Sequence, residues 1–199
     1  GLVKCTATEW PRALCKAIDI AADNQSPSTV AAALLAEVFE APADSEVALR
    51  GVTRRIVQHV PATAAPSTIP LDSRSVVVVT GGGKGVTAAS TVALARAVGC
   101  RIVILGRSPL SGAPGDEIAA TLAAVEAAGS KVRYLSVDVR DADAVARAMA
   151  DVRREWGPIT GLVHGAGVIA DSRIVNKTSA QFDSVFGTKV IGLRSLLKI

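Results

Sequence analysis

The chain has 199 residues, of which 49% are apolar and 20% are charged, and its net charge at pH 7 is +4. This balance is typical of a globular protein and excludes a disordered tail, because such tails bury too little apolar surface. Aromatic residues make up only 3%, too few for a surface on which bases stack, so no nucleic-acid partner is expected. No apolar run approaches the roughly 20 residues that a membrane helix needs, so no membrane association is expected.

The cysteines and the start of the chain bear on where the protein acts. Cys5, Cys15 and Cys100 form no close pair and show no metal-ligand spacing. This pattern predicts free thiols in a reducing compartment, the cytoplasm, and no metal site. The chain shows no signal pattern at its start. Because it begins with Gly1 rather than Met, a processed or excised piece of a longer protein is expected.

A segment rich in Pro, Ala and Thr, residues 61–74, is predicted to be a linker. Before it, the patterns predict a helix over 2–14 that Pro11 interrupts or ends, strands over 16–20, 46–50 and 55–60, and a helix over 29–36 that Ser26 caps. About 60 residues bury too small a core to fold well alone. This part is therefore expected to pack against another segment.

After the linker, strand and helix patterns alternate. The expected strands cover 75–79, 101–105, 131–137 and 159–163, and the expected helices cover 87–98, 116–128, 142–156 and 181–198. Asp141 is the expected cap of the third helix, which Gly157 ends. The alternation predicts an α/β fold with a Rossmann-like, doubly wound parallel sheet.

The turn after the first of these strands is rich in glycine. It reads Thr80, Gly81, Gly82, Gly83, Lys84, Gly85 and Val86. Glycines let a backbone approach a pyrophosphate closely, and the N–H groups at the start of the next helix bind that anion. The spacing is not that of a P-loop, and the alternative is a flexible loop without a ligand.

The second strand ends at Arg107 and Ser108, where sites that prefer NAD usually place an acid. A cation and a hydroxyl suit a 2′-phosphate, so NADPH is the predicted cofactor. Lys84 is a second candidate cation. The alternative is that both basic side chains are surface cations.

The ends of the third and fourth strands supply further candidate contacts with a cofactor. They are Asp138 and Val139 after the third strand, and His164, Gly165, Ala166 and Gly167 after the fourth. Asp138 is a candidate partner for an adenine amino group or a cap for the next turn. The glycines permit close approach to the nicotinamide ribose. His164 is a candidate base, although a packed histidine at a strand end is the favoured interpretation.

Together these motifs resemble the short-chain dehydrogenase/reductase superfamily, and within it the ketoreductase domain of polyketide, polyunsaturated-fatty-acid and enediyne synthases. The resemblance covers nearly the whole chain. It implies that residues 1–60 end a structural pseudo-reductase subdomain and that 75–199 are the NADPH-binding part of a catalytic subdomain. It also implies hydride transfer from NADPH to the 3-keto group of a thioester on an acyl carrier protein, with neighbouring synthase domains as further partners.

The chain departs from the family pattern at two places. Thr87 stands where the superfamily usually has its third glycine, a change that the iterative synthases share. The family's catalytic Ser and Tyr are expected beyond Ile199, since the only tyrosine, Tyr134, lies in a strand. The chain alone is therefore expected to be inactive.

The resemblance assigns one catalytic residue, Lys189, to the last helix, where ordinary superfamily members have Asn. A surface lysine is the alternative. An apolar stripe is predicted from the helical spacing of Phe186, Val190, Leu193 and Leu197. Lys189 adjoins this stripe, so its amine is expected to reach inward. There it would lower the pKa of a tyrosine and bind the nicotinamide ribose.

Two other functions stay open: a non-catalytic scaffold domain of a synthase, and a free-standing dehydrogenase, against which the leading 60 residues argue. Asp171 is all that remains of the Leu-Asp-Asp motif of reductases that form D-hydroxy products. The D product is expected.

Overall fold

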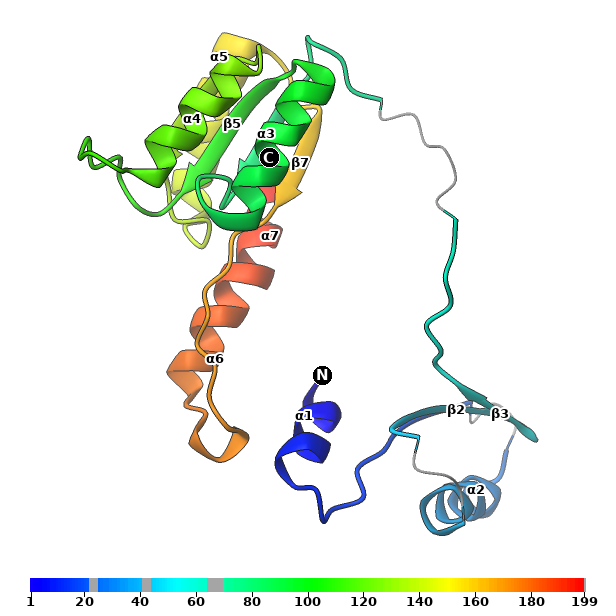
Figure 1. Ribbon diagram of the computed structural model, residues 1–199. Coiled ribbons are helices and arrows are strands. Elements are labelled where there is room, and N and C mark those ends of the chain that lie inside the picture. The colour runs from blue at the N-terminus through cyan, green and yellow to red at the C-terminus, as the bar shows by residue number, and fades with distance from the viewer. Residues whose placement is uncertain (22–24, 41–43, 64–69, 199) are drawn as a thin grey trace. The chain divides into compact units, whose positions relative to one another are not determined.

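The computed structural model describes residues 1–21, 25–40, 44–63 and 70–198. The chain divides into two units, Gly1–Pro66 with Ser172–Lys177, and Ser67–Asp171 with Thr178–Ile199 (Figure 1). Part of the predicted linker, residues 64–69, lies outside the described residues. Among the described residues, no helix is long and apolar enough to cross a membrane.

The smaller unit contains the predicted two helices and three strands. They are α1 (Leu2–Glu9), β1 (Ala17–Ile20), α2 (Pro27–Phe39), β2 (Glu46–Arg50) and β3 (Thr53–Ile56). Strand β2 lies in the middle, parallel to β1 and antiparallel to β3. The Ser26 side chain accepts a hydrogen bond from the Thr29 N–H at 3.1 Å, so the predicted cap of α2 is confirmed.

One predicted boundary in this unit is confirmed and one is wrong. Helix α1 ends at Glu9, as expected if Pro11 ends it, because Trp10 precedes Pro11 and leaves the helical conformation, with φ −123° and ψ 73°. The third strand covers Thr53–Ile56 rather than 55–60, because Gly51 adopts φ +58° and closes a tight hairpin that pairs Arg50 with Thr53. A short 3₁₀ helix, η1 (Ile174–Asn176), was not predicted, and its first N–H donates to the Glu9 carboxylate at 2.8 Å.

A buried ion cluster joins α2 to the strands of the smaller unit. The Glu37 carboxylate, 4% exposed, accepts hydrogen bonds from Lys16 Nζ at 2.6 Å and from Arg54 Nε at 2.8 Å. Arg54 also pairs with Asp44 at 2.9 Å. The bonds from Arg54 and Lys16 lower the pKa of Glu37 to about 2. The two basic side chains thus neutralise the buried Glu37 carboxylate, in a unit whose apolar core is small.

The larger unit is a Rossmann-like, doubly wound parallel sheet, as predicted. Its elements are β4 (Val76–Thr80), α3 (Gly85–Val98), β5 (Arg101–Gly106), α4 (Glu117–Ala127), β6 (Val132–Ser136), α5 (Ala142–Trp156), β7 (Gly161–His164), α6 (Ser179–Phe186), a π-helical turn η2 (Gly187–Ile191) and α7 (Gly192–Leu196). The strand order is β6-β5-β4-β7, and every pair is parallel. The chain therefore reverses its winding direction between β4 and β7, where such folds bind ligands.

Helices cover both faces of this sheet, which explains why β4 and β5 are apolar without alternation. One face packs against α5 and α7 through Val76, Val78, Val103, Leu105, Val145, Met149, Val152 and Leu196. The other packs against α3 and α4 through Val77, Val79, Ile102, Ile104, Ala95, Cys100 and Val125 (Figure 1). The predicted cap is confirmed, since Asp141 accepts from the Ala144 N–H at 2.9 Å.

The last helical segment differs from its prediction as a single helix. It begins at Ser179, and the π turn Gly187–Ile191 interrupts it, which adds a residue to one turn and rotates the faces of α7. The predicted apolar stripe is wrong, because Phe186, Val190 and Leu197 are 44%, 40% and 69% exposed. The buried positions are instead Gly187, Thr188, Gly192, Ser195 and Leu196.

Candidate functional site

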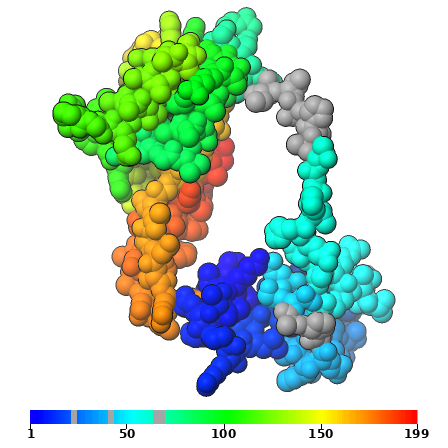
Figure 2. All heavy atoms as spheres, viewed as in Figure 1, coloured from blue at the N-terminus to red at the C-terminus, as the bar shows by residue number. Residues whose placement is uncertain are grey.

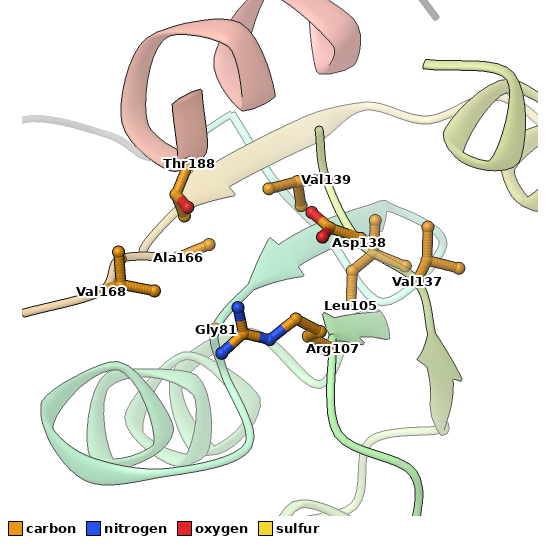
Figure 3. A pocket seen from close by; sticks show the side chains of 11 residues that line it. Gly81, Leu105, Arg107, Val137, Asp138, Val139, Ala166, Val168 and Thr188 are labelled. Carbon is orange, nitrogen blue, oxygen red and sulfur yellow. The ribbon is translucent and has the colours of Figure 1, made fainter. Parts of the chain in front are cut away.

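A cleft opens at the carboxyl ends of the parallel strands (Figure 3). It is lined by Gly81, Leu105, Gly106, Arg107, Val137, Asp138, Val139, Ala166, Gly167, Val168 and Thr188. Six of these were predicted site residues: Gly81, Arg107, Asp138, Val139, Ala166 and Gly167. The structure thus brings together residues from four strand ends that lie far apart in the sequence.

Gly81 is the point at which the glycine-rich turn meets the end of β7. Its φ is +70°, and a Cβ there would lie 2.9 Å from the backbone N and Cα of Ala166. No side chain fits in this contact, and the left-handed conformation disfavours one independently. The Gly81 N–H donates to the Leu105 carbonyl at 2.8 Å, which ties the turn to β5 as well.

The other residues of the turn do not line the cleft. Gly82 and Gly83 are buried, and a Cβ would lie 2.7 Å from Val79 Cγ1 in the first case and 3.2 Å from Ile118 Cγ1 in the second. They let the turn pack closely on the sheet and on α4. Lys84, Gly85 and Val86 are exposed, and Lys84 Nζ lies 3.5 Å from the Glu117 carboxylate.

A hydrogen-bonded group joins the ends of β4 and β7. Thr80 is fully buried, and its hydroxyl lies 2.8 Å from His164 Nδ1 and 3.1 Å from the Ala166 N–H. His164 Nε2 lies 3.0 Å from the Lys189 carbonyl oxygen. Both ring nitrogens therefore have partners within the chain, which favours the packed histidine over the base.

Gly165 and Thr87 are matched in size. A Cβ at Gly165 would collide with the Thr87 side chain. Thr87 stands where the superfamily usually has its third glycine. Its side chain fills space that Gly165, after the end of β7, leaves free.

Arg107 extends from the end of β5 into the cleft, toward Gly81 (Figure 3). Its neighbour Ser108 does not line the cleft, and the Ser108 carbonyl oxygen accepts a hydrogen bond from the Tyr134 hydroxyl at 2.5 Å. At the position where an acid would select NAD, the cleft therefore carries a guanidinium group.

Asp138 lines the cleft but already has a strong partner. Arg140 Nη2 donates to its Oδ2 at 2.7 Å, and the Arg140 N–H donates to its Oδ1 at 3.0 Å. The bonds from Arg140, with the nearby charge of Arg107, lower the pKa of Asp138. An adenine amino group would therefore meet an ionised carboxylate that Arg140 already orients.

The π turn brings Lys189 to the end of β7. A Cβ added at Gly167 would lie 3.0 Å from Lys189 Cε and 3.1 Å from its Nζ, so the amine lies directly beside the Gly167 backbone. Gly187 and Gly192 stand one π turn apart and accept Arg140 and Val139: a Cβ would lie 3.4 Å from Arg140 Cδ and 2.7 Å from Val139 Cγ2, respectively. These two glycines let the turn pack on the loop that carries Asp138.

Sequence reasoning did not single out five residues of the cleft: Leu105, Gly106, Val137, Val168 and Thr188. Gly106, Val137 and Val168 each adjoin a predicted site residue in the sequence, and Leu105 lies two residues before Arg107. Extension of each motif by one or two residues would have found them. Thr188 adjoins Lys189, and its burial follows from the π turn, whose trace in the sequence is the pair of glycines Gly187 and Gly192.

The comparisons with known proteins agree with this geometry. The KR domain family matches residues 75–199. The chain is 29% identical to a polyunsaturated fatty acid synthase polypeptide of a Thraustochytrium species, over 99% of this chain and 9% of that protein. It therefore spans a small part of a much longer relative.

Solved structures show the same fold. An A-type ketoreductase of a modular polyketide synthase is 26% identical, with a TM-score of 0.78 over 99% of this chain and 41% of the other. A short-chain dehydrogenase from Mycobacterium paratuberculosis, solved bound to NAD, is 25% identical, with a TM-score of 0.56 over 63% of this chain and 49% of the other. Fold, cleft and sequence agree, and the chain belongs to the KR domain family, the ketoreductase domains of polyketide and polyunsaturated-fatty-acid synthases.

Proposed function

We propose that the chain provides the NADPH site of a β-ketoacyl reductase domain in a multidomain synthase. In this proposal, residues 1–60 end a structural subdomain, 61–74 link it to the next, and 75–199 hold the cofactor. The complete domain reduces a 3-ketoacyl thioester on an acyl carrier protein to the 3-hydroxy product.

The observation that carries the choice of cofactor is the Arg107 guanidinium in the cleft. The residues present fit a dinucleotide phosphate, since Gly81 allows a close backbone approach and the first turn of α3 carries no side-chain cap on its N–H groups. Arg107 adds a charge-assisted donor at the end of β5, where a 2′-phosphate would need one. The NAD bound by the Mycobacterium dehydrogenase supports a nicotinamide dinucleotide in this fold.

NADPH, when bound, supplies the hydride, and the protein's part is to bind, orient and stabilise charge. Lys189 Nζ lies beside Gly167, at the end of β7 where the nicotinamide ribose is proposed to bind. A cation there would donate to a ribose hydroxyl and lower the pKa of a neighbouring proton donor. Tyr134 is not this donor, because its hydroxyl bonds to Ser108. The proposal therefore places the donor outside the 199 residues.

The partners follow from the same proposal. An acyl carrier protein delivers the thioester, and neighbouring synthase domains adjoin the chain. The net charge of +4 suits an acidic carrier surface. The retained Asp171 is the basis for expecting a D-hydroxy product.

Titration of the chain with NADPH and with NADH, followed by nicotinamide fluorescence, tests the cofactor. We expect saturable binding with at least tenfold tighter binding of NADPH, because a charge-assisted contact contributes about 1.5–3 kcal/mol. Equal affinities would refute the assignment of Arg107. A longer polypeptide that includes the complete domain should then reduce a 3-ketoacyl thioester, and binding without any turnover would instead favour a scaffold function.

A further inference from the structure

Two side chains of β6 hold the backbone that carries Arg107 and Ser108. The Tyr134 hydroxyl donates to the Ser108 carbonyl at 2.5 Å, and the Ser136 hydroxyl donates to the Arg107 carbonyl at 3.2 Å. Residues two apart in a strand point to the same face, so both hydroxyls approach the turn from one side. The register, which pairs Ser136 with Gly106, places them there.

Gly106 leaves the space that this arrangement needs. A Cβ at Gly106 would collide with the Tyr134 hydroxyl and lie 3.1 Å from the ring carbon Cε2. The glycine before Arg107 and the tyrosine of the next strand are thus matched. Partial burial and the charge of Asp116 raise the pKa of Tyr134, so its hydroxyl keeps its proton and donates at neutral pH.

The segment between β5 and α4, residues 107–116, is also fixed at its far end. Asp116 Oδ2 accepts from the Ser111 N–H at 2.9 Å and from the Ser111 hydroxyl at 2.7 Å, while Oδ1 caps α4 through the Ile118 N–H at 2.9 Å. Between these anchors the segment is exposed and projects from the larger unit (Figure 2). Little apolar packing holds this segment. The hydrogen bonds at its ends therefore fix the position of the Arg107 backbone, from which the side chain extends.

We infer that Tyr134 and Ser136 are positioning residues that set the preference for NADPH over NADH by holding Arg107 and Ser108 ready for the 2′-phosphate. The inference rests on the proposed cofactor. A loop that is ordered before binding loses less entropy when it meets its ligand, so the anchors add affinity without touching the cofactor. Only the ligand that carries the 2′-phosphate gains from this order.

The test compares Tyr134→Phe, Ser136→Ala and the double variant with wild type in titrations with NADPH and NADH. Tyr134→Phe keeps the ring over Gly106 and removes only the donor. Ser130→Ala is the matched control, because Ser130 also donates to a backbone carbonyl, that of Ala95 at 3.5 Å, at the opposite end of β6.

We expect each single variant to lower NADPH affinity about threefold to tenfold, the range for one hydrogen bond, and the double variant to lower it further. NADH affinity should stay within about twofold, and Ser130→Ala should leave the ratio of the two affinities unchanged. Parallel losses for both cofactors would show a merely structural role and overturn the inference, as would an unchanged ratio in the double variant. If wild type itself shows no preference, the proposed cofactor fails first, and the inference fails with it.

Discussion

The contact between Gly81 and Ala166 predicts how strongly one methyl group would disturb the larger unit. In Gly81→Ala, the new Cβ would lie 2.9 Å from two Ala166 backbone atoms at a residue whose φ is +70°. The left-handed conformation costs about 1–2 kcal/mol, and forced overpacking adds about 1–3 kcal/mol. We therefore expect the free energy of unfolding to fall by about 2–5 kcal/mol.

Gly99→Ala is the matched control. Gly99 has nearly the same φ, +67°, but a Cβ there meets nothing within 4 Å, so only the conformational cost of about 1–2 kcal/mol remains. Gly99 also precedes β5, at the end of the sheet away from the cleft. Urea unfolding followed by Trp156 fluorescence, in a Trp10→Phe background, measures both variants. Equal destabilisation would refute the close contact between the β4 turn and the β7 end, and NADPH affinity should fall for Gly81→Ala alone.

The remaining predictions address single side chains and one segment. Arg107→Asp should lower NADPH affinity about tenfold or more and leave NADH affinity nearly unchanged; a common loss in both titrations would contradict this. Lys189→Ala, in a polypeptide with the complete domain, should reduce ketoacyl reduction by about 10²–10⁴-fold with a stability change within about 0.5 kcal/mol, and near-normal turnover would make it a surface lysine. Because the folded pKa of Glu37 is about 2 against 4.5, the stability it contributes is present above pH 4.5 and lost as the pH falls toward 2. Glu37→Gln should abolish this dependence in acid titrations followed by circular dichroism, and an unchanged dependence would contradict the cluster. Residues 1–60 expressed alone should show no cooperative thermal transition.

The Rossmann-like sheet and most of its cleft could be predicted because they depend on local signals. Uninterrupted β-branched runs mark strands that are covered on both faces, and a glycine-rich turn between strand and helix marks the ligand edge. Gly81, Arg107 and Asp138 each lie within two residues of a strand end, so topology alone gathers them in one cleft.

The features that were missed depend on geometry that no single segment encodes. The apolar stripe around Lys189 assumed 3.6 residues per turn, but a π turn replaces one helical turn. Two glycines five residues apart, Gly187 and Gly192, are the trace of this turn in the sequence. The role of Tyr134 could not be predicted from its position in a strand, because its bond to Ser108 depends on the register between β5 and β6.

The hydrogen bonds of His164 show how the strand ends and the π turn act together. The Lys189 carbonyl can only accept, so His164 Nε2 carries the proton and donates to it across 3.0 Å. In the neutral ring Nδ1 must then accept, which makes the Thr80 hydroxyl its donor, and that hydroxyl in turn accepts from the Ala166 N–H. Every donor in this series meets an acceptor within the chain, which favours the packed histidine. His164 therefore ties the backbone of Lys189 to the sheet, so the strand end that borders the cleft also fixes the turn from which the amine reaches Gly167.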